Sequence, residues 1–315
     1  AKNSYVAIGD VAAYAQWVNG LTFVTLENAA LDAATFQAAL QPYTSGDLIL
    51  AESRLRQYLA DYPQGLSQIE ARFYLAQILW DQNKIEQALV HYEGIRALGL
   101  SDYSEPSLVR LSEYYLSQKR YQRAQTYLEE LLAIVVYPKN KLFAIRGTMQ
   151  SCYALEQYDE ALLRVEQILV LEKVDQDLVL EALLLKARSL VALGQRPQAR
   201  VAYKVLAPLA TQELAAEVLY HEAYFNHLDQ DFEASNVLIQ ELAQEHPSYP
   251  YYGAKGLVLM ALNFEGLNDL QQEQPSAAFL EDLELRLDAL QQKRRKPLFA
   301  WWVWSVLGAV VIVSG

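Results

Sequence analysis

Apolar residues recur at three- and four-residue spacing over most of the chain, which is the period of an amphipathic helix. The pattern is clear in residues 72–80 and 85–95, and the segment between them is short and polar. Connections this short join helices that lie antiparallel to each other. The pattern therefore predicts an all-α chain built from pairs of helices.

An alanine recurs in the second helix of each predicted pair at a nearly constant interval. The six alanines are Ala51, Ala88, Ala124, Ala161, Ala199 and Ala234, separated by 37, 36, 37, 38 and 35 residues. A residue able to pack follows four positions later each time, and a small residue often stands twelve positions earlier, with Met149 and Glu222 as exceptions. A fixed period of this length is the signature of a repeat protein. Because small residues let two backbones approach closely, we expect these alanines to be buried where helices cross.

These features resemble the tetratricopeptide repeat family. The clearest match is residues 73–80 (Phe-Tyr-Leu-Ala-Gln-Ile-Leu-Trp) followed by Ala88 and Tyr92, and residues 121–124 and 158–161 repeat part of it. The usual Trp early in the first helix is absent, and the period exceeds the family's usual length of about 34 residues. The resemblance implies a right-handed superhelical solenoid of antiparallel helix pairs. It also implies the following division: 1–35 as the end of a preceding repeat or an N-terminal cap, 36–250 as six repeats, and 251–292 as a degenerate C-terminal repeat or capping helices.

The ends of two predicted helices narrow this resemblance to a subgroup of the family. Residues 58–63 read Tyr-Leu-Ala-Asp-Tyr-Pro and residues 242–247 read Leu-Ala-Gln-Glu-His-Pro. Both are similar to segments of bacterial cell-envelope tetratricopeptide proteins, including long repeat proteins of the Bacteroidetes. The resemblance implies a role inside an envelope complex.

The composition fits a packed helical repeat, because 52% of the residues are hydrophobic and Gly and Pro number only 13 and 10. The formal charge is −12, but four basic residues at 293–296 are the last charged residues of the chain, so residues 1–292 carry −16. An acidic body of this size repels a phosphate backbone. We therefore expect no nucleic-acid partner.

The C-terminal segment 293–315 is predicted to be a basic flank followed by a transmembrane helix. The uncharged stretch 297–315 has 19 residues, which is about 28 Å of helix against a hydrocarbon core of roughly 30 Å. The flank and the aromatic residues beside it are Lys293, Arg294, Arg295, Lys296, Trp301, Trp302 and Trp304. The positive-inside rule places the solenoid in the cytoplasm, whereas the envelope resemblance favours the periplasm. The side stays open, as does whether the start without Met reflects a removed leader or a longer chain.

The sequence favours no catalytic or metal site. His221 and His227 are six residues apart, about 120° apart around a helix, whereas the zinc motif needs histidines four apart. Cys152 stands at an apolar position with no basic neighbour and is expected to be a buried, unreactive thiol. No glycine-rich phosphate loop, GxSxG or CxxC occurs. We expect neither an enzyme nor a cofactor.

In the tetratricopeptide fold, the first helix of each pair lines a concave groove, so the repeat register indicates candidate lining residues. They are Phe73, Gln77, Trp80, Glu113, Leu116, Arg146, Gln150, Tyr153, Arg188 and Asn226. Only Arg146 with Gln150 approaches the pair with which some family members bind chaperone C-termini. A mixed aromatic and polar groove fits an extended or helical peptide. The sequence thus predicts a membrane-anchored scaffold that binds a partner protein, and the alternative is a structural spacer in a larger machine without a groove ligand.

Overall fold

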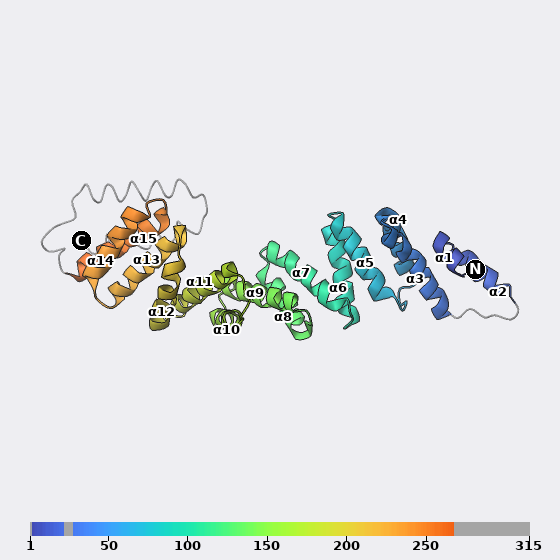
Figure 1. Ribbon diagram of the computed structural model, residues 1–315, viewed down its shortest axis with the longest axis horizontal. Helices are drawn as coiled ribbons and strands as arrows, with labels where there is room; N and C mark the ends of the chain where they lie inside the picture. The colour runs from blue at the N-terminus through green and yellow to red at the C-terminus, as the bar shows by residue number, and fades with distance from the viewer. Residues whose placement is uncertain (1, 22–27, 268–315) are drawn as a thin grey trace, which may run out of the picture. The chain divides into compact units, whose positions relative to one another are not determined.

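The computed structural model describes residues 2–21 and 28–267, and their regular structure is entirely helical (Figure 1). The helices are α1 (Lys2–Ile8), α2 (Val11–Asn19), α3 (Asn28–Ser45), α4 (Leu48–Asp61), α5 (Gln68–Asp81), α6 (Ile85–Leu98), α7 (Ser104–Ser117), α8 (Tyr121–Ile134), α9 (Pro138–Ala154), α10 (Tyr158–Leu169), α11 (Gln176–Ala192), α12 (Arg196–Leu206), the 3-10 helix η1 (Ala207–Leu209), α13 (Gln212–Leu228), α14 (Phe232–Glu245) and α15 (Pro250–Gly266).

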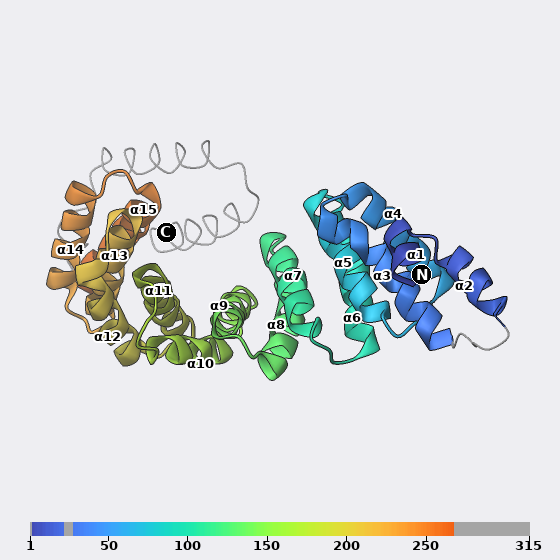
Figure 2. The ribbon, with the colours of Figure 1, turned by 45° about the vertical axis from the view of Figure 1, so that its right-hand side comes forward.

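The described residues divide into two compact units, with the boundary between residues 174 and 175. In the first unit, α3 to α10 form four helix pairs, and each helix packs against the next (Figure 2). In the second unit, α11 with α12 and α13 with α14 form two pairs, and α15 packs on the second of them. The predicted all-α arrangement of helix pairs is confirmed. The first pair begins at Asn28, ahead of the expected boundary at residue 36, and α1 and α2 precede it.

The helix crossings hold the small residues that the repeat predicts. Ala51, Ala88, Ala124, Ala161 and Ala199 have no exposed surface. The residues four positions later are also completely buried: Leu55, Tyr92, Leu128, Val165 and Tyr203. The close approach of two helices at each alanine is therefore filled by the larger side chain one turn further on.

The last of the six predicted alanines is wrong by one position. Ala234 keeps part of its surface exposed, whereas its neighbour Ser235 is completely buried. Ser235 follows Ala199 by 36 residues, and the residue twelve before it is Ala223, which is completely buried too. Ile239 rather than Leu238 then fills the crossing, since Ile239 is buried. The corrected register removes the exception that Glu222 made.

The turn inside each pair repeats one backbone conformation. The residues two positions before the second helices have positive φ angles: 87° at Gly46, 60° at Asn83, 55° at Lys119, 60° at Glu156, 70° at Gly194 and 65° at Gln230. This left-handed region is costly for residues other than glycine, and four of the six are not glycine. All six pairs adopt this conformation at the same place, so the turn conformation is part of the repeat.

The aromatic-proline end of α4 closes the first full pair. The rings of Tyr58 and Tyr62 stack with their centroids 5.4 Å apart. The Tyr58 hydroxyl donates a hydrogen bond of 2.5 Å to Asp32 on α3, and the backbone N–H of Leu66 donates one of 2.7 Å to the same carboxylate. This motif therefore ties the end of α4 to both the first helix of its pair and the following loop.

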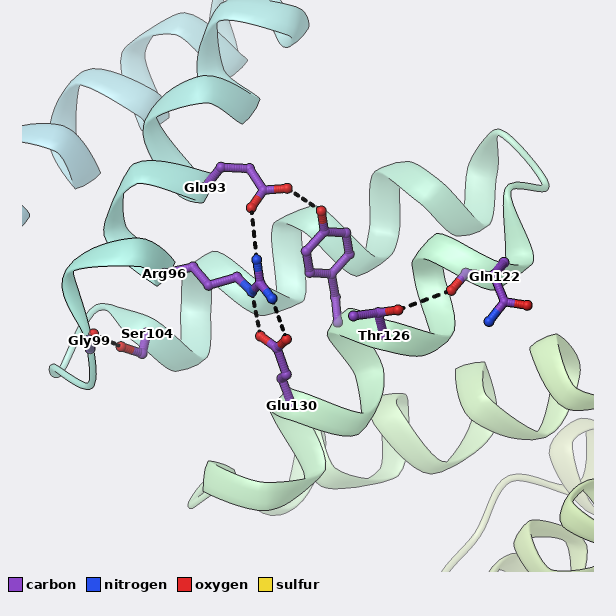
Figure 3. A network of polar contacts seen from close by, with 8 residues as sticks. Glu93, Arg96, Gly99, Ser104, Gln122, Thr126 and Glu130 are labelled. Atoms are coloured by element: carbon purple, nitrogen blue, oxygen red, sulfur yellow. Dashed lines mark hydrogen bonds and ion pairs between the residues drawn. The ribbon is translucent and has the colours of Figure 1, made fainter.

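Polar side chains also join neighbouring pairs within the first unit (Figure 3). Arg96 on α6 donates two hydrogen bonds of 2.6 Å to Glu130 on α8. Arg96 also lies 3.5 Å from Glu93, which accepts a hydrogen bond from the Tyr127 hydroxyl. The bidentate geometry fixes the second helices of adjacent pairs against each other.

Candidate functional site

Trp80 is a half-buried aromatic residue near the end of α5, the first helix of its pair. Its half-buried indole packs against the core, with its centroid 6.2 Å from that of Tyr92. On the other side, the guanidinium carbon of Arg110 on α7 lies 5.1 Å from the indole centroid. Arg110 also pairs with Glu113 at 3.1 Å, and the two charged side chains keep 38% and 41% of their surface exposed.

Trp80, Arg110 and Glu113 together form a surface that joins α5 to α7, which we call the Trp80 surface. The sequence predicted Trp80 and Glu113 there but missed Arg110. Its spacing from Glu113 is three residues, which puts both side chains on one side of a helix. That spacing was the available signal.

The other residues predicted to line this face differ in how much of their side chain is exposed. Phe73 is a core residue instead: its ring lies 4.8 Å from that of Tyr103 and 6.4 Å from that of Tyr92. Gln77 and Leu116 are half-buried, and Leu116 packs against the core. Phe73 therefore stabilises the α5–α6 pair from inside the core and does not offer a surface for a ligand, contrary to the prediction.

Three predicted residues lie on α9, in the fourth pair. Arg146 is exposed, whereas Gln150 and Tyr153 are half-buried. The Tyr153 ring meets that of Tyr158 edge-on at 5.8 Å. Their spacing of three and four residues places them on one side of α9.

In the second unit, Arg188 and Asn226 are engaged in internal contacts. Arg188 donates hydrogen bonds of 2.8 and 2.5 Å to the buried Glu217. Asn226 accepts one of 3.1 Å from Arg200, which also pairs with Asp229 at 2.5 Å. Both side chains hold neighbouring helices together in this structure.

The corrected register points to residues in the second unit that the sequence prediction missed. Tyr224 on α13 follows the predicted groove residue Arg188 by 36 positions and is half-buried, and the buried Tyr220 lies one turn before it. Their rings stack 6.3 Å apart, and the Lys255 ammonium lies 4.2 Å from the Tyr220 centroid. Burial lowers the pKa of Lys255. Glu222 departs from the pattern of small residues twelve positions before each alanine, and this departure was the signal that could have revealed these residues.

The titratable groups singled out in the sequence take part in internal packing: Cys152 is buried, and His221 and His227 are half-buried. The His221 ring stacks on Tyr203 at 4.4 Å, and burial lowers its pKa to about 4. The His227 Nδ1 lies 2.6 Å from the Asn263 side-chain oxygen. Cys152 is buried, and burial raises the pKa of its thiol. Among residues 2–21 and 28–267, no three His, Cys, Asp or Glu side chains are grouped so that they could hold a metal ion.

The membrane prediction concerns residues 293–315, which lie outside the described part of the chain. Of the helices between Lys2 and Gly266, none combines the length and apolar content that crossing a bilayer requires.

The chain is similar to solved structures of tetratricopeptide repeat proteins. A protein from Parabacteroides merdae shares 15% identity over 81% of this chain and 98% of its own, with a TM-score of 0.40. PilF from Pseudomonas aeruginosa shares 21% over 71% and 97%, with a TM-score of 0.41. The C-terminal part of a repeat protein from Cytophaga hutchinsonii shares 15% over 78% and 94%, with a TM-score of 0.45. No family model and no curated protein matches the sequence.

At these identities the likeness concerns the fold alone, and the helix pairs of the structure define that fold directly. The described residues form a helical-repeat protein of the tetratricopeptide-like class.

Proposed function

We propose that this chain is a scaffold that binds a segment of a partner protein on the first-helix face of its first unit. Helical-repeat arrays offer extended surfaces built from the same helix of successive repeats. The observation that carries the proposal is the Trp80 surface. Trp and Arg are the residue types that most often dominate binding energy, and here they stack on each other while both remain partly accessible.

The chemistry of this surface favours a short peptide segment with both apolar and polar groups. The indole offers an apolar contact, Arg110 offers donors for a carbonyl or carboxylate, and Glu113 offers an acceptor. Gln77, three residues before Trp80, adds an amide on the same helix face. An extended or helical peptide can use such a row of groups. We propose no catalytic activity and no cofactor.

Site-specific photo-crosslinking tests the proposed face. A photoreactive amino acid replaces Gln77 on the first helix of the second full pair, and the control replaces Val90 on the second helix of the same pair. Val90 is a good control because 65% of its surface is exposed. We expect partner proteins to be crosslinked from position 77 and not from position 90. Equal crosslinking from both, or none from position 77, would contradict binding on this face and favour the spacer role.

We also propose that residues 293–315 anchor the chain in a membrane of the bacterial envelope. The support is the sequence: a basic flank, three tryptophans beside it and an uncharged stretch of bilayer length. The full-length chain should sediment with membranes, and a chain ending before Lys293 should remain in the supernatant as a folded helical protein. A full-length chain that stays soluble without detergent or lipid would rule out the anchor.

A further inference from the structure

The turn between α7 and α8 carries an exposed basic patch, although residues 1–292 are acidic overall. Lys119, Arg120 and Arg123 lie within five residues of one another and all are exposed. None of the three forms an ion pair with any side chain in the described ranges 2–21 and 28–267. We call these three residues the basic patch.

A comparison with the preceding helix pair shows that the basic patch lacks a carboxylate partner. Lys84 holds the position that corresponds to Arg120, and it pairs with Glu52 at 3.0 Å. Glu52 directly follows the crossing residue Ala51 on α4. The residue that directly follows the next crossing alanine is Leu89, which is buried. The second pair thus supplies an apolar side chain where the first supplies a carboxylate, and Arg120 is left without an internal partner.

The basic patch surrounds a shallow cavity of about 490 Å³. Its lining consists of Lys119, Arg120, Tyr121, Gln122, Arg123, Thr126 and Leu155. The Arg123 guanidinium lies 5.0 Å above the Tyr115 ring, which restrains the side chain and leaves its N–H donors available. The cavity therefore places three cationic side chains around a lining that is mostly apolar.

We propose that the basic patch binds an acidic segment of a partner protein. Arginine side chains recognise carboxylates through paired hydrogen bonds. Because residues 1–292 carry −16 overall, a local cluster of three positive charges attracts an acidic segment more strongly than the acidic surface of these residues does. The patch belongs to the α7–α8 turn and the start of α8, whereas the Trp80 surface belongs to α5 and α7. The two proposals share no residue, so separate variants test them.

The test is the affinity of the full-length chain for a short fluorescein-labelled peptide rich in glutamate, measured by fluorescence anisotropy. The patch variant carries Arg120→Gln and Arg123→Gln. The matched control carries Lys139→Gln and Lys141→Gln, which remove the same charge from two exposed lysines on α9 in the same unit. We expect the patch variant to bind at least about tenfold more weakly, since charge-assisted hydrogen bonds are lost, and the control to bind as the parent does.

Lys119→Glu provides a second variant, because it reverses the charge of an exposed side chain without removing a residue from the core. Its affinity should fall as well, with an unchanged thermal unfolding curve. Equal losses in the patch variant and the control would show a general effect of net charge and would overturn the proposal. An absence of peptide binding, or tighter binding of a single-stranded oligonucleotide than of the peptide, would also overturn it.

Discussion

Glu217 is a carboxylate buried in the second unit, and each of its oxygens accepts two hydrogen bonds. One oxygen accepts from Arg188 and from the Tyr203 hydroxyl at 2.9 Å, and the other accepts from Arg188 and from the Tyr252 hydroxyl at 2.7 Å. These partners come from α11, α12 and α15. A buried charge is tolerated only when it is paired and fully hydrogen-bonded, and Glu217 meets that condition.

The ionisation of Glu217 predicts a loss of stability in acid. Burial by itself raises the pKa of this carboxyl, but the hydrogen bonds and charge of Arg188 and the two tyrosine hydroxyls outweigh it and lower the pKa from 4.5 to about 2. The folded pKa lies below the unfolded one, so the stabilisation is complete above about pH 4.5 and is lost as the pH falls toward about 2, to the extent of about 3 kcal/mol.

Urea unfolding of the full-length chain over this pH range measures the effect. Glu217→Gln should lower the free energy of unfolding at neutral pH by about 2 kcal/mol, because Arg188 loses its charge partner but stays partly hydrated. It should also flatten the acid dependence. Glu213→Gln, on the exposed first turn of the same helix, should leave both unchanged. An acid dependence as steep in Glu217→Gln as in the parent would assign the effect to other groups.

Among the elements, the second helices depend on one small residue each, and the α13–α14 pair allows a sharp test of which residue that is. Ser235→Leu should destabilise the fold by about 1–3 kcal/mol, because added methylene groups overpack a crossing that has no free space. Ala161→Leu should do the same in α10. Ala234→Leu should change stability by less than about 0.5 kcal/mol, since Ala234 is partly exposed. Thermal unfolding of the three variants decides: greater harm from Ala234→Leu than from Ser235→Leu would restore the original register.

The helix pairs also show how much of the fold could be predicted from the sequence. Helix pairs and five of the six crossings follow from composition and period alone, because a small residue, a packing residue four later and a polar turn recur together. Ala234 misled because it is small, like Ser235 beside it, and because Leu238 and Ile239 are both apolar. In such a neighbourhood only the residue twelve earlier distinguishes the two registers, and it favoured Ala223 over Glu222.

The candidate site was harder to predict than the fold, for a physical reason. Periodicity tells which helix face a residue occupies but not how deeply its neighbours cover it. Phe73 and Trp80 share one predicted face, yet Tyr103 from the following loop covers Phe73. Arg110 on α7 contacts Trp80 on α5 of the preceding pair. The spacing of Arg110 from Glu113 shows which side of α7 it occupies, but the local pattern does not show which residue of another helix it contacts.

For the molecule as a whole, the scaffold and spacer roles differ in whether the first-helix face has a ligand. Trp80 is the residue on which the difference rests, because it packs on Tyr92 and also meets Arg110 at the surface. Its loss affects both folding and any binding. A single variant therefore has to be measured in two ways.

The decisive measurement is the unfolding temperature and the partner affinity per folded molecule of Trp80→Ala, with the partner identified by crosslinking at position 77. The comparison variant is Tyr62→Ala, a half-buried aromatic at the end of α4 that stacks on Tyr58. We predict that Trp80→Ala weakens binding by about 2 kcal/mol or more, whereas Tyr62→Ala lowers the unfolding temperature and leaves affinity unchanged. A Trp80→Ala variant that is less stable but binds its partner with the parent's affinity would contradict the proposed function.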